Sequence, residues 1–160
     1  MSRGRLEGRI ALVTGASRGI GRAVAKRFAA EGAQLILVAR TSGALEEADD
    51  QVRAAGAAPA MLVPLDLRQG DLIDQMGAAL HERYGRLDIL VGNAAMLGGL
   101  FPVGHYSPDI WESVLAINLT ANWRLIRSLD PLLRQSEAGR AMFVTSGVTE
   151  DEPPPFWAAY

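Results

Sequence analysis

The sequence predicts an α/β domain built on a parallel sheet, and three observations carry the prediction. Short apolar runs are nearly continuous, as in strands that are covered on both faces. The stretches between them place apolar residues three and four positions apart, which is typical of helices. The two kinds of segment alternate strictly, and this favours parallel strands joined by right-handed crossovers. We therefore expect one domain over residues 1–160.

Each strand is expected where an apolar run is bounded by polar residues or glycine. The runs are short enough for strands and too short for helices that cross a domain. Five strands are predicted, at Ile10–Thr14, Leu35–Ala39, Ala60–Leu65, Leu87–Val91 and Ala141–Thr145.

Four helices are expected between these strands. The first follows Gly19 and stops near Gly32, and the second is capped by Thr41 or Ser42 and ends near Gly56. The third spans about Asp71 to Tyr84. The fourth begins at Ser107, a cap residue before a proline, and we expect Pro131 to bend or break its end. One face of this helix carries Trp111, Val114, Leu115, Asn118, Leu119, Trp123 and Ile126.

Composition excludes several functional classes. The chain has no cysteine, which excludes disulfides, thiolate zinc sites and a cysteine nucleophile, and its two histidines lack the spacing of a metal site. A formal net charge of −2 gives no basic surplus for binding nucleic acid or a membrane surface. Since no apolar run approaches the length of a membrane span and no secretory signal is visible, we expect a cytoplasmic protein.

The segment Thr14–Gly21 reads TGASRGIG and joins the first strand to the first helix. Gly15 can take the tight turn out of the strand, while Gly19 and Gly21 allow a phosphate group and a neighbouring strand to approach the backbone. The free N–H groups of a helix N-terminus bind phosphate. The segment therefore predicts a dinucleotide-binding loop, and the alternative is a tight turn without a ligand.

With the spacing Thr-Gly-x-x-x-Gly-x-Gly, the chain resembles the short-chain dehydrogenase/reductase family from Gly8 to Tyr160. The resemblance implies a Rossmann-type doubly wound sheet with strand order 3-2-1-4-5. It also implies an oxidoreductase that transfers hydride between a nicotinamide cofactor and a small-molecule carbonyl or alcohol substrate.

The end of the second predicted strand bears on the choice of dinucleotide. NAD-binding sites of this kind carry an acidic residue there, whereas this chain has Ala39 followed by Arg40. A guanidinium binds a 2′-phosphate, and Arg18 in the glycine loop supplies a second one. We therefore expect NADP(H) rather than NAD(H). The alternative for Arg40 is a solvated residue at a strand end.

The resemblance also marks positions beyond the glycine loop. It implies that Asp66 contacts the adenine amino group and that Asn93, within Gly92–Ala95, lines the nicotinamide side. Asp66 has the alternative of a turn or N-cap aspartate. The expected cofactor-binding residues are Gly15, Ser17, Arg18, Gly19, Ile20, Gly21, Arg40, Asp66, Leu67, Asn93 and Ala94.

Three catalytic residues are implied by the same resemblance. Asn118 matches the asparagine that holds a water relay, with a buried amide satisfied by backbone as the alternative. Ser146 matches the serine that binds the carbonyl oxygen, with a turn serine as the alternative. Tyr160 matches the general acid of the reduction.

The family motif is Tyr-x-x-x-Lys, and its lysine would fall beyond the last residue of this chain. We therefore expect a domain that is incomplete at its C-terminus and lacks the C-terminal strands and helices of the full fold. Two further hypotheses stay open: a truncated, non-catalytic dinucleotide-binding fragment, and a scaffold that binds no cofactor, which the intact glycine loop disfavours. A homo-oligomer through the fourth helix is also expected, because truncation would expose its apolar face.

Overall fold

A computed structural model describes residues 4–147 and Phe156. Its centre is a five-stranded sheet in the order β3-β2-β1-β4-β5, and every neighbouring pair of strands is parallel. The fold class and strand order predicted from the sequence are thus confirmed, with strand ends shifted by up to two residues. The strands are β1 Ile10–Thr14, β2 Gln34–Ala39, β3 Met61–Pro64, β4 Ile89–Gly92 and β5 Arg140–Phe143.

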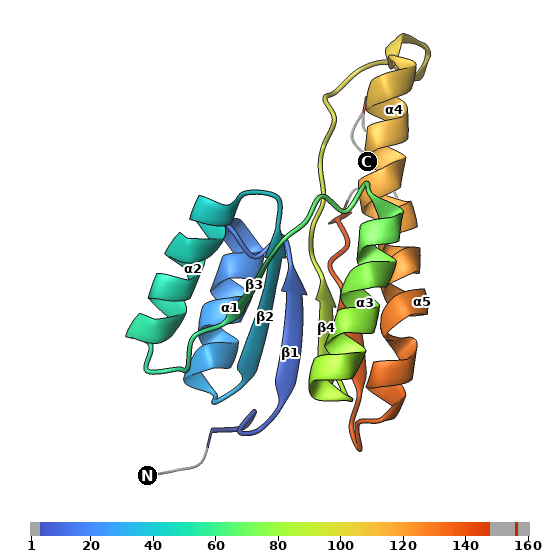
Figure 1. Ribbon diagram of the computed structural model, residues 1–160. Coiled ribbons are helices and arrows are strands. Elements are labelled where there is room, and N and C mark those ends of the chain that lie inside the picture. Colours follow the sequence, from blue (N-terminus) through green and yellow to red (C-terminus); the bar gives the residue numbers. More distant parts are fainter. Residues whose placement is uncertain (1–3, 148–155, 157–160) are drawn as a thin grey trace.

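The helices form two layers around this sheet (Figure 1). The helices α1 and α2 cover one face, and α3 and α5 cover the other, while α4 extends beyond the end of the sheet (Figure 1). The longer helical segments are α1 Gly19–Ala30, α2 Ser42–Ala54, α3 Gly70–Tyr84, α4 Pro108–Leu115 and α5 Ala121–Arg134. The π-helix Ala116–Thr120 joins α4 to α5, and the short 3-10 helix Val103–His105 precedes α4.

The pleat of the strands divides the buried residues into two apolar cores, because successive side chains point to opposite faces. In β1, Ile10 and Leu12 pack toward α3 and α5, whereas Ala11 and Val13 pack toward α1 and α2. Small alanines at positions 25 and 29 of α1 let this helix lie close to the sheet. The near-continuous apolar runs of the sequence reflect this coverage on both faces.

The fourth predicted helix corresponds to α4, the π-helix and α5 taken together. Ser107 caps its start, since its Oγ accepts the N–H of Ile110 at 3.4 Å and Pro108 occupies the first turn. Pro131 does not break the helix, because α5 continues past it to Arg134. Leu129 and Leu132 are buried against the sheet, and this packing offsets the backbone hydrogen bond that proline cannot make.

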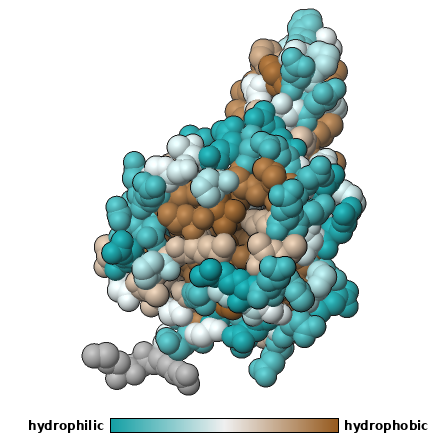
Figure 2. All heavy atoms as spheres, in the orientation of Figure 1, coloured by the Kyte–Doolittle hydropathy of each residue, from teal (hydrophilic) through white to brown (hydrophobic). Residues whose placement is uncertain are grey.

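The apolar face predicted for that helix is only partly buried. Val114 is fully buried, but Leu119, Trp123 and Ile126 are 65%, 53% and 45% exposed. Figure 2 shows a further apolar patch near the centre of the molecule, between α2 and α3, with hydrophilic residues around it. None of the helices in the described part of the chain is long and apolar enough to span a membrane.

Candidate functional site

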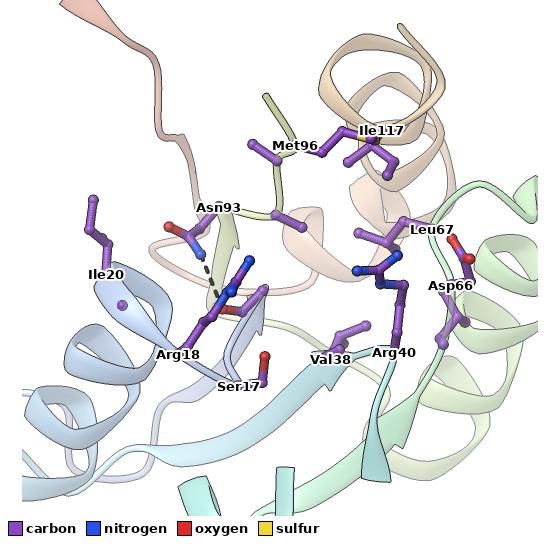
Figure 3. A pocket seen from close by; sticks show the side chains of 16 residues that line it. Ser17, Arg18, Ile20, Val38, Arg40, Asp66, Leu67, Asn93, Met96 and Ile117 are labelled. Carbon is purple, nitrogen blue, oxygen red and sulfur yellow. Dashed lines mark hydrogen bonds between the residues drawn. The ribbon is translucent and has the colours of Figure 1, made fainter. Parts of the chain in front are cut away.

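A cavity of about 280 Å³ lies at the carboxyl ends of the strands (Figure 3). It opens where the chain order reverses between β1 and β4, the point at which open α/β sheets bind their ligands. Ten of the cofactor-binding residues predicted from the sequence line it, and the exception is Gly21. The lining consists of Gly15, Ser17, Arg18, Gly19, Ile20, Val38, Ala39, Arg40, Leu65, Asp66, Leu67, Asn93, Ala94, Ala95, Met96 and Ile117.

The glycine loop is pressed against the end of β4. Gly15 has a φ of +63°, a conformation that residues with a side chain rarely adopt. Gly21 lies behind the cavity wall, where a Cβ atom would come within 2.4 Å of the Gly15 carbonyl oxygen and 2.6 Å of the Asn93 amide nitrogen. The third glycine of the motif is therefore required by this close approach of helix α1 to the loop and to Asn93.

The N-terminus of α1 is open toward the cavity. Its N-cap residue, Arg18, makes no side-chain cap hydrogen bond, and the first turn carries no acidic residue. The loop is braced from outside by Arg22, whose Nε donates to the Ser17 carbonyl oxygen at 2.7 Å and whose Nη2 also reaches Glu47 on α2 at 3.4 Å. Free N–H groups, the positive end of the helix dipole and a braced loop together form an anion-binding site.

Thr14 fastens the loop to β4. Its hydroxyl donates to the Val91 carbonyl at 3.3 Å and accepts the backbone N–H groups of Asn93 and Ala94 at 2.9 and 3.0 Å. The Asn93 amide in turn donates to the Thr14 carbonyl at 3.0 Å. It also donates to the Gly15 carbonyl at 3.3 Å (Figure 3). The structural role of Thr14 was missed in the sequence. The available signal was a polar residue at the end of an apolar strand, and the structure shows that this residue is fully buried.

Two arginines point into the cavity, Arg18 from the glycine loop and Arg40 from the end of β2 (Figure 3). Neither side chain has an ion-pair partner among residues 4–147 and Phe156. Positive charge that is not neutralised within this described part of the protein is suited to an anionic ligand group.

Asp66, on the same side as Arg40, is paired with Arg68 instead. The Arg68 side chain contacts both carboxylate oxygens, and its backbone N–H donates to Asp66 Oδ1 at 3.0 Å. The Arg68 side-chain hydrogen bonds lower the pKa of Asp66, with burial opposing and the charge of Arg40 adding to the effect. Asp66 thus forms the turn that the sequence analysis gave as its alternative role, and it also lines the cavity.

Asn118 lies on the π-helix and pairs with the backbone of Met96. The Met96 N–H donates to Asn118 Oδ1, and Asn118 Nδ2 donates to the Met96 carbonyl, both at 3.0 Å. Its own carbonyl accepts the Asn122 side-chain amide at 2.8 Å. The amide of Asn118 is therefore satisfied by backbone, the alternative noted from the sequence, and it supports the cavity wall through Met96.

The other two predicted catalytic residues are less closely tied to the cavity. Ser146 follows β5 by three residues, is half-buried and is not among the lining residues. Tyr160 lies outside the described residues. Sequence reasoning missed several apolar lining residues, whose signal is their place beside predicted ones: Val38, Leu65, Ala95, Met96 and Ile117.

A doubly wound parallel sheet, a glycine loop that opens a helix, and a cavity at the point of strand reversal define a Rossmann-type nucleotide-binding domain. The family model for short chain dehydrogenases matches residues 9–160. The chain belongs to the short chain dehydrogenase family.

Three similar proteins illustrate the relationship. The uncharacterized oxidoreductase YciK of Escherichia coli K12 is 36% identical over 146 residues, a match that covers 89% of this chain and 58% of the relative. An uncharacterized NAD-dependent oxidoreductase of Mycobacterium tuberculosis, MT0715, is 34% identical over 155 residues, covering 89% of this chain and 56% of the relative. The chain thus spans a little over half the length of these curated relatives.

A solved structure gives a comparison with bound cofactor. A protein of Escherichia coli CFT073 described as a short chain dehydrogenase was determined in complex with NADPH. It is 33% identical to this chain, with a TM-score of 0.92, and the match covers 100% of this chain and 67% of that one.

Proposed function

We propose that this chain binds NADP(H) in the cavity at the carboxyl ends of the strands, as the nucleotide-binding part of an oxidoreductase. The observation that carries the proposal is the pair Arg18 and Arg40, which line the cavity without ion-pair partners in residues 4–147 and Phe156. The 2′-phosphate distinguishes NADP(H) from NAD(H), and guanidinium groups bind phosphate through paired, charge-assisted hydrogen bonds.

The donor set fits this cofactor from one end to the other. The open N-terminus of α1 suits the pyrophosphate, and a Cβ atom at Gly19 would meet no neighbouring atom, so the loop leaves space above it. Asp66 can accept the adenine amino group, and Asn93 and Ala94 line the opposite end of the cavity, where the nicotinamide would lie. NADPH bound to a structural relative supports the same assignment, while another relative is named NAD-dependent.

The proposed reaction is hydride transfer with a carbonyl or alcohol substrate. The bound nicotinamide supplies hydride to a carbonyl carbon or accepts it from an alcohol. In the proposal, the Ser146 hydroxyl hydrogen-bonds the substrate oxygen and Tyr160 donates or accepts its proton. Asn118 supports the cavity wall through its hydrogen bonds with Met96. The second candidate is a dinucleotide-binding fragment without catalysis, since the match of this chain to the relative YciK covers only 58% of that relative.

Binding and turnover test the two candidates separately. We expect NADPH fluorescence to be enhanced on binding, with tighter binding than NADH, and expect Arg40→Gln to reduce the affinity for NADPH much more than that for NADH. Turnover is measured as NADPH oxidation with ketones and quinones, and Tyr160→Phe should abolish it. Binding without turnover supports the fragment, and absence of nucleotide binding overturns both candidates.

A homo-oligomer through the fourth predicted helix is part of this proposal. The exposed side chains of Leu119, Trp123 and Ile126 lie along the π-helix and α5, and such apolar stripes mark contact surfaces. Cytoplasmic location also remains a prediction of the sequence.

A further inference from the structure

Arg68 has no place in the glycine motif or in the function proposed above, yet it is closely tied to the cavity wall. Its Nε lies 3.1 and 3.0 Å from the two carboxylate oxygens of Asp66, and its Nη2 lies 2.6 Å from Oδ2. The backbone N–H of the same residue donates to Oδ1 at 3.0 Å. Arg68 therefore makes three side-chain contacts and one backbone contact with one carboxylate, and charge-assisted hydrogen bonds of this kind are stronger than neutral ones.

This carboxylate stands beside Arg40. Asp66 and Arg40 line the same cavity, and the close-up shows their side chains next to each other (Figure 3). Arg40 has no ion pair with any residue in the described part of the chain, whereas both carboxylate oxygens of Asp66 are paired with Arg68. A carboxylate that lies beside Arg40 and has no other partner would compete with a ligand phosphate for the Arg40 guanidinium.

We infer that Arg68 sets the preference for a 2′-phosphate by holding the Asp66 carboxylate and so keeping Arg40 free to bind that phosphate. The inference rests on the proposed function, since it assumes that the adenosine end of a dinucleotide occupies this side of the cavity. Arg68 is a positioning residue in this scheme. It acts on the phosphate through Asp66 and Arg40 and makes no contact with it.

Charge counting gives the direction of the effect. Arg40, Asp66 and Arg68 together carry one net positive charge, which is left on Arg40 when the other two pair. Without Arg68, Arg40 and Asp66 carry no net charge and can pair with each other. The phosphate would then have to break that pair, which we expect to cost about a tenfold loss of preference.

The test measures the dissociation constants of 2′,5′-ADP and 5′-ADP by calorimetry, because these fragments isolate the 2′-phosphate from the nicotinamide and from catalysis. The preference is the ratio of the two constants. It is measured for the parent chain, Arg68→Gln, Asp66→Asn and the double variant. Arg53→Gln is the matched control, since Arg53 is exposed in the last turn of α2 and has no ion pair among the described residues.

Arg68→Gln should lower the preference for 2′,5′-ADP about tenfold with little change for 5′-ADP, because only the 2′-phosphate needs Arg40 free. In the Asp66→Asn background the same substitution should have almost no effect, because no carboxylate remains to capture Arg40. Arg53→Gln should leave the ratio unchanged. Arg68→Lys keeps the charge without the planar fork and should give an intermediate ratio.

The possible outcomes distinguish a failure of the inference from a failure of the proposed function. A parent chain that binds neither fragment, or prefers 5′-ADP, overturns the proposed function. A parent preference that survives Arg68→Gln overturns the inference alone. An equal loss in the presence and absence of the Asp66 carboxylate also overturns it, because Arg68 would then act directly on the phosphate. Circular dichroism melts establish that each variant is folded. If Arg68→Gln does not fold, Arg68→Lys replaces it in the comparison.

Discussion

The side-chain amide of Asn118 forms two hydrogen bonds with the backbone of Met96, one in each direction and both 3.0 Å long. The two residues come from different segments, the π-helix between α4 and α5 and the loop that follows β4. Because Met96 lines the cavity, this pair connects the long helical segment to the wall of the candidate site.

Replacement of Asn118 by leucine keeps a similar volume but removes both partners of Met96. A polar group left unsatisfied costs about 1–3 kcal/mol when buried and less when partly buried, as here, so we expect a lower midpoint of thermal unfolding and weaker NADPH binding. Asn122→Ala is the control, since it removes a single hydrogen bond, to the Asn118 carbonyl. Calorimetric melts and NADPH titrations would contradict the prediction if Asn118→Leu behaved like the control.

Gly21→Ala should damage the glycine loop. The new methyl group would lie 2.4 Å from the Gly15 carbonyl oxygen, so helix α1 or the loop must shift, and we expect NADPH affinity to fall at least about tenfold. Gly43→Ala is a matched substitution near the start of α2, where a Cβ atom meets no neighbour. That variant should bind normally and be more stable by about 0.5–1 kcal/mol, because alanine favours helix. Equal nucleotide binding by the two variants would be the contrary result.

Stability toward acid should depend on Asp88. Burial opposes ionisation of this carboxyl, but hydrogen bonds from Ser136, the Ile10 backbone, Arg9 and Arg86 outweigh it and lower its pKa to about 2. A group with a depressed pKa in the folded state stabilises the protein above its unfolded value and loses that contribution as the pH falls through the folded value. We therefore expect about 2 kcal/mol of stability to disappear between about pH 4 and pH 2.

Urea unfolding across this pH range checks the prediction for Asp88. In Asp88→Asn the acid-dependent loss should be much smaller, and the variant should already be less stable at neutral pH. The control is Asp71→Asn, which removes a carboxylate whose side chain is 91% exposed. If the loss of stability at low pH were identical in the parent and in Asp88→Asn, other carboxylates would control it.

Self-association should depend on the exposed stripe of α5. Trp123 and Ile126 are 53% and 45% exposed, and the Arg127 guanidinium lies over the Trp123 ring at 5.5 Å. We expect the parent chain to form oligomers in sedimentation velocity, and Trp123→Glu with Ile126→Glu to shift it toward monomer, because a desolvated charge opposes the contact. Val103→Glu, on the exposed 3-10 helix, should leave the distribution unchanged. A parent chain that is monodisperse, monomeric and cooperatively melting would contradict the prediction.

The fold was predictable because its signals are local. Each buried strand is a short apolar run, and the alternation with helical spacing leaves few topologies for a parallel sheet. The start of α4 was equally readable, since Ser107 followed by Pro108 combines a cap with a preset first turn. The strand order rested on the family resemblance and is confirmed by the pairing of β1 with both β2 and β4.

What could not be predicted depends on contacts between distant segments. The interruption of the fourth helix by a π-helix coincides with the bonds from Asn118 to Met96 and from Asn122 to Asn118, and no pattern of apolar residues encodes them. The continuation of α5 past Pro131 follows from packing on the sheet. Arg22 was missed because its partner is a backbone carbonyl, which every residue has.

Four of the polar side chains that line the cavity come from four separate connections. Arg18 follows β1, Arg40 follows β2, Asp66 follows β3 and Asn93 follows β4. No two of these four share a loop, and the contacts of Thr14 and Gly15 with Asn93 link the connections after β1 and β4, so the turn after β2 is a separate unit. We expect that transplanting only the turn after β2 from a relative named NAD-dependent would weaken the proposed preference for NADP(H) without redesign of the sheet.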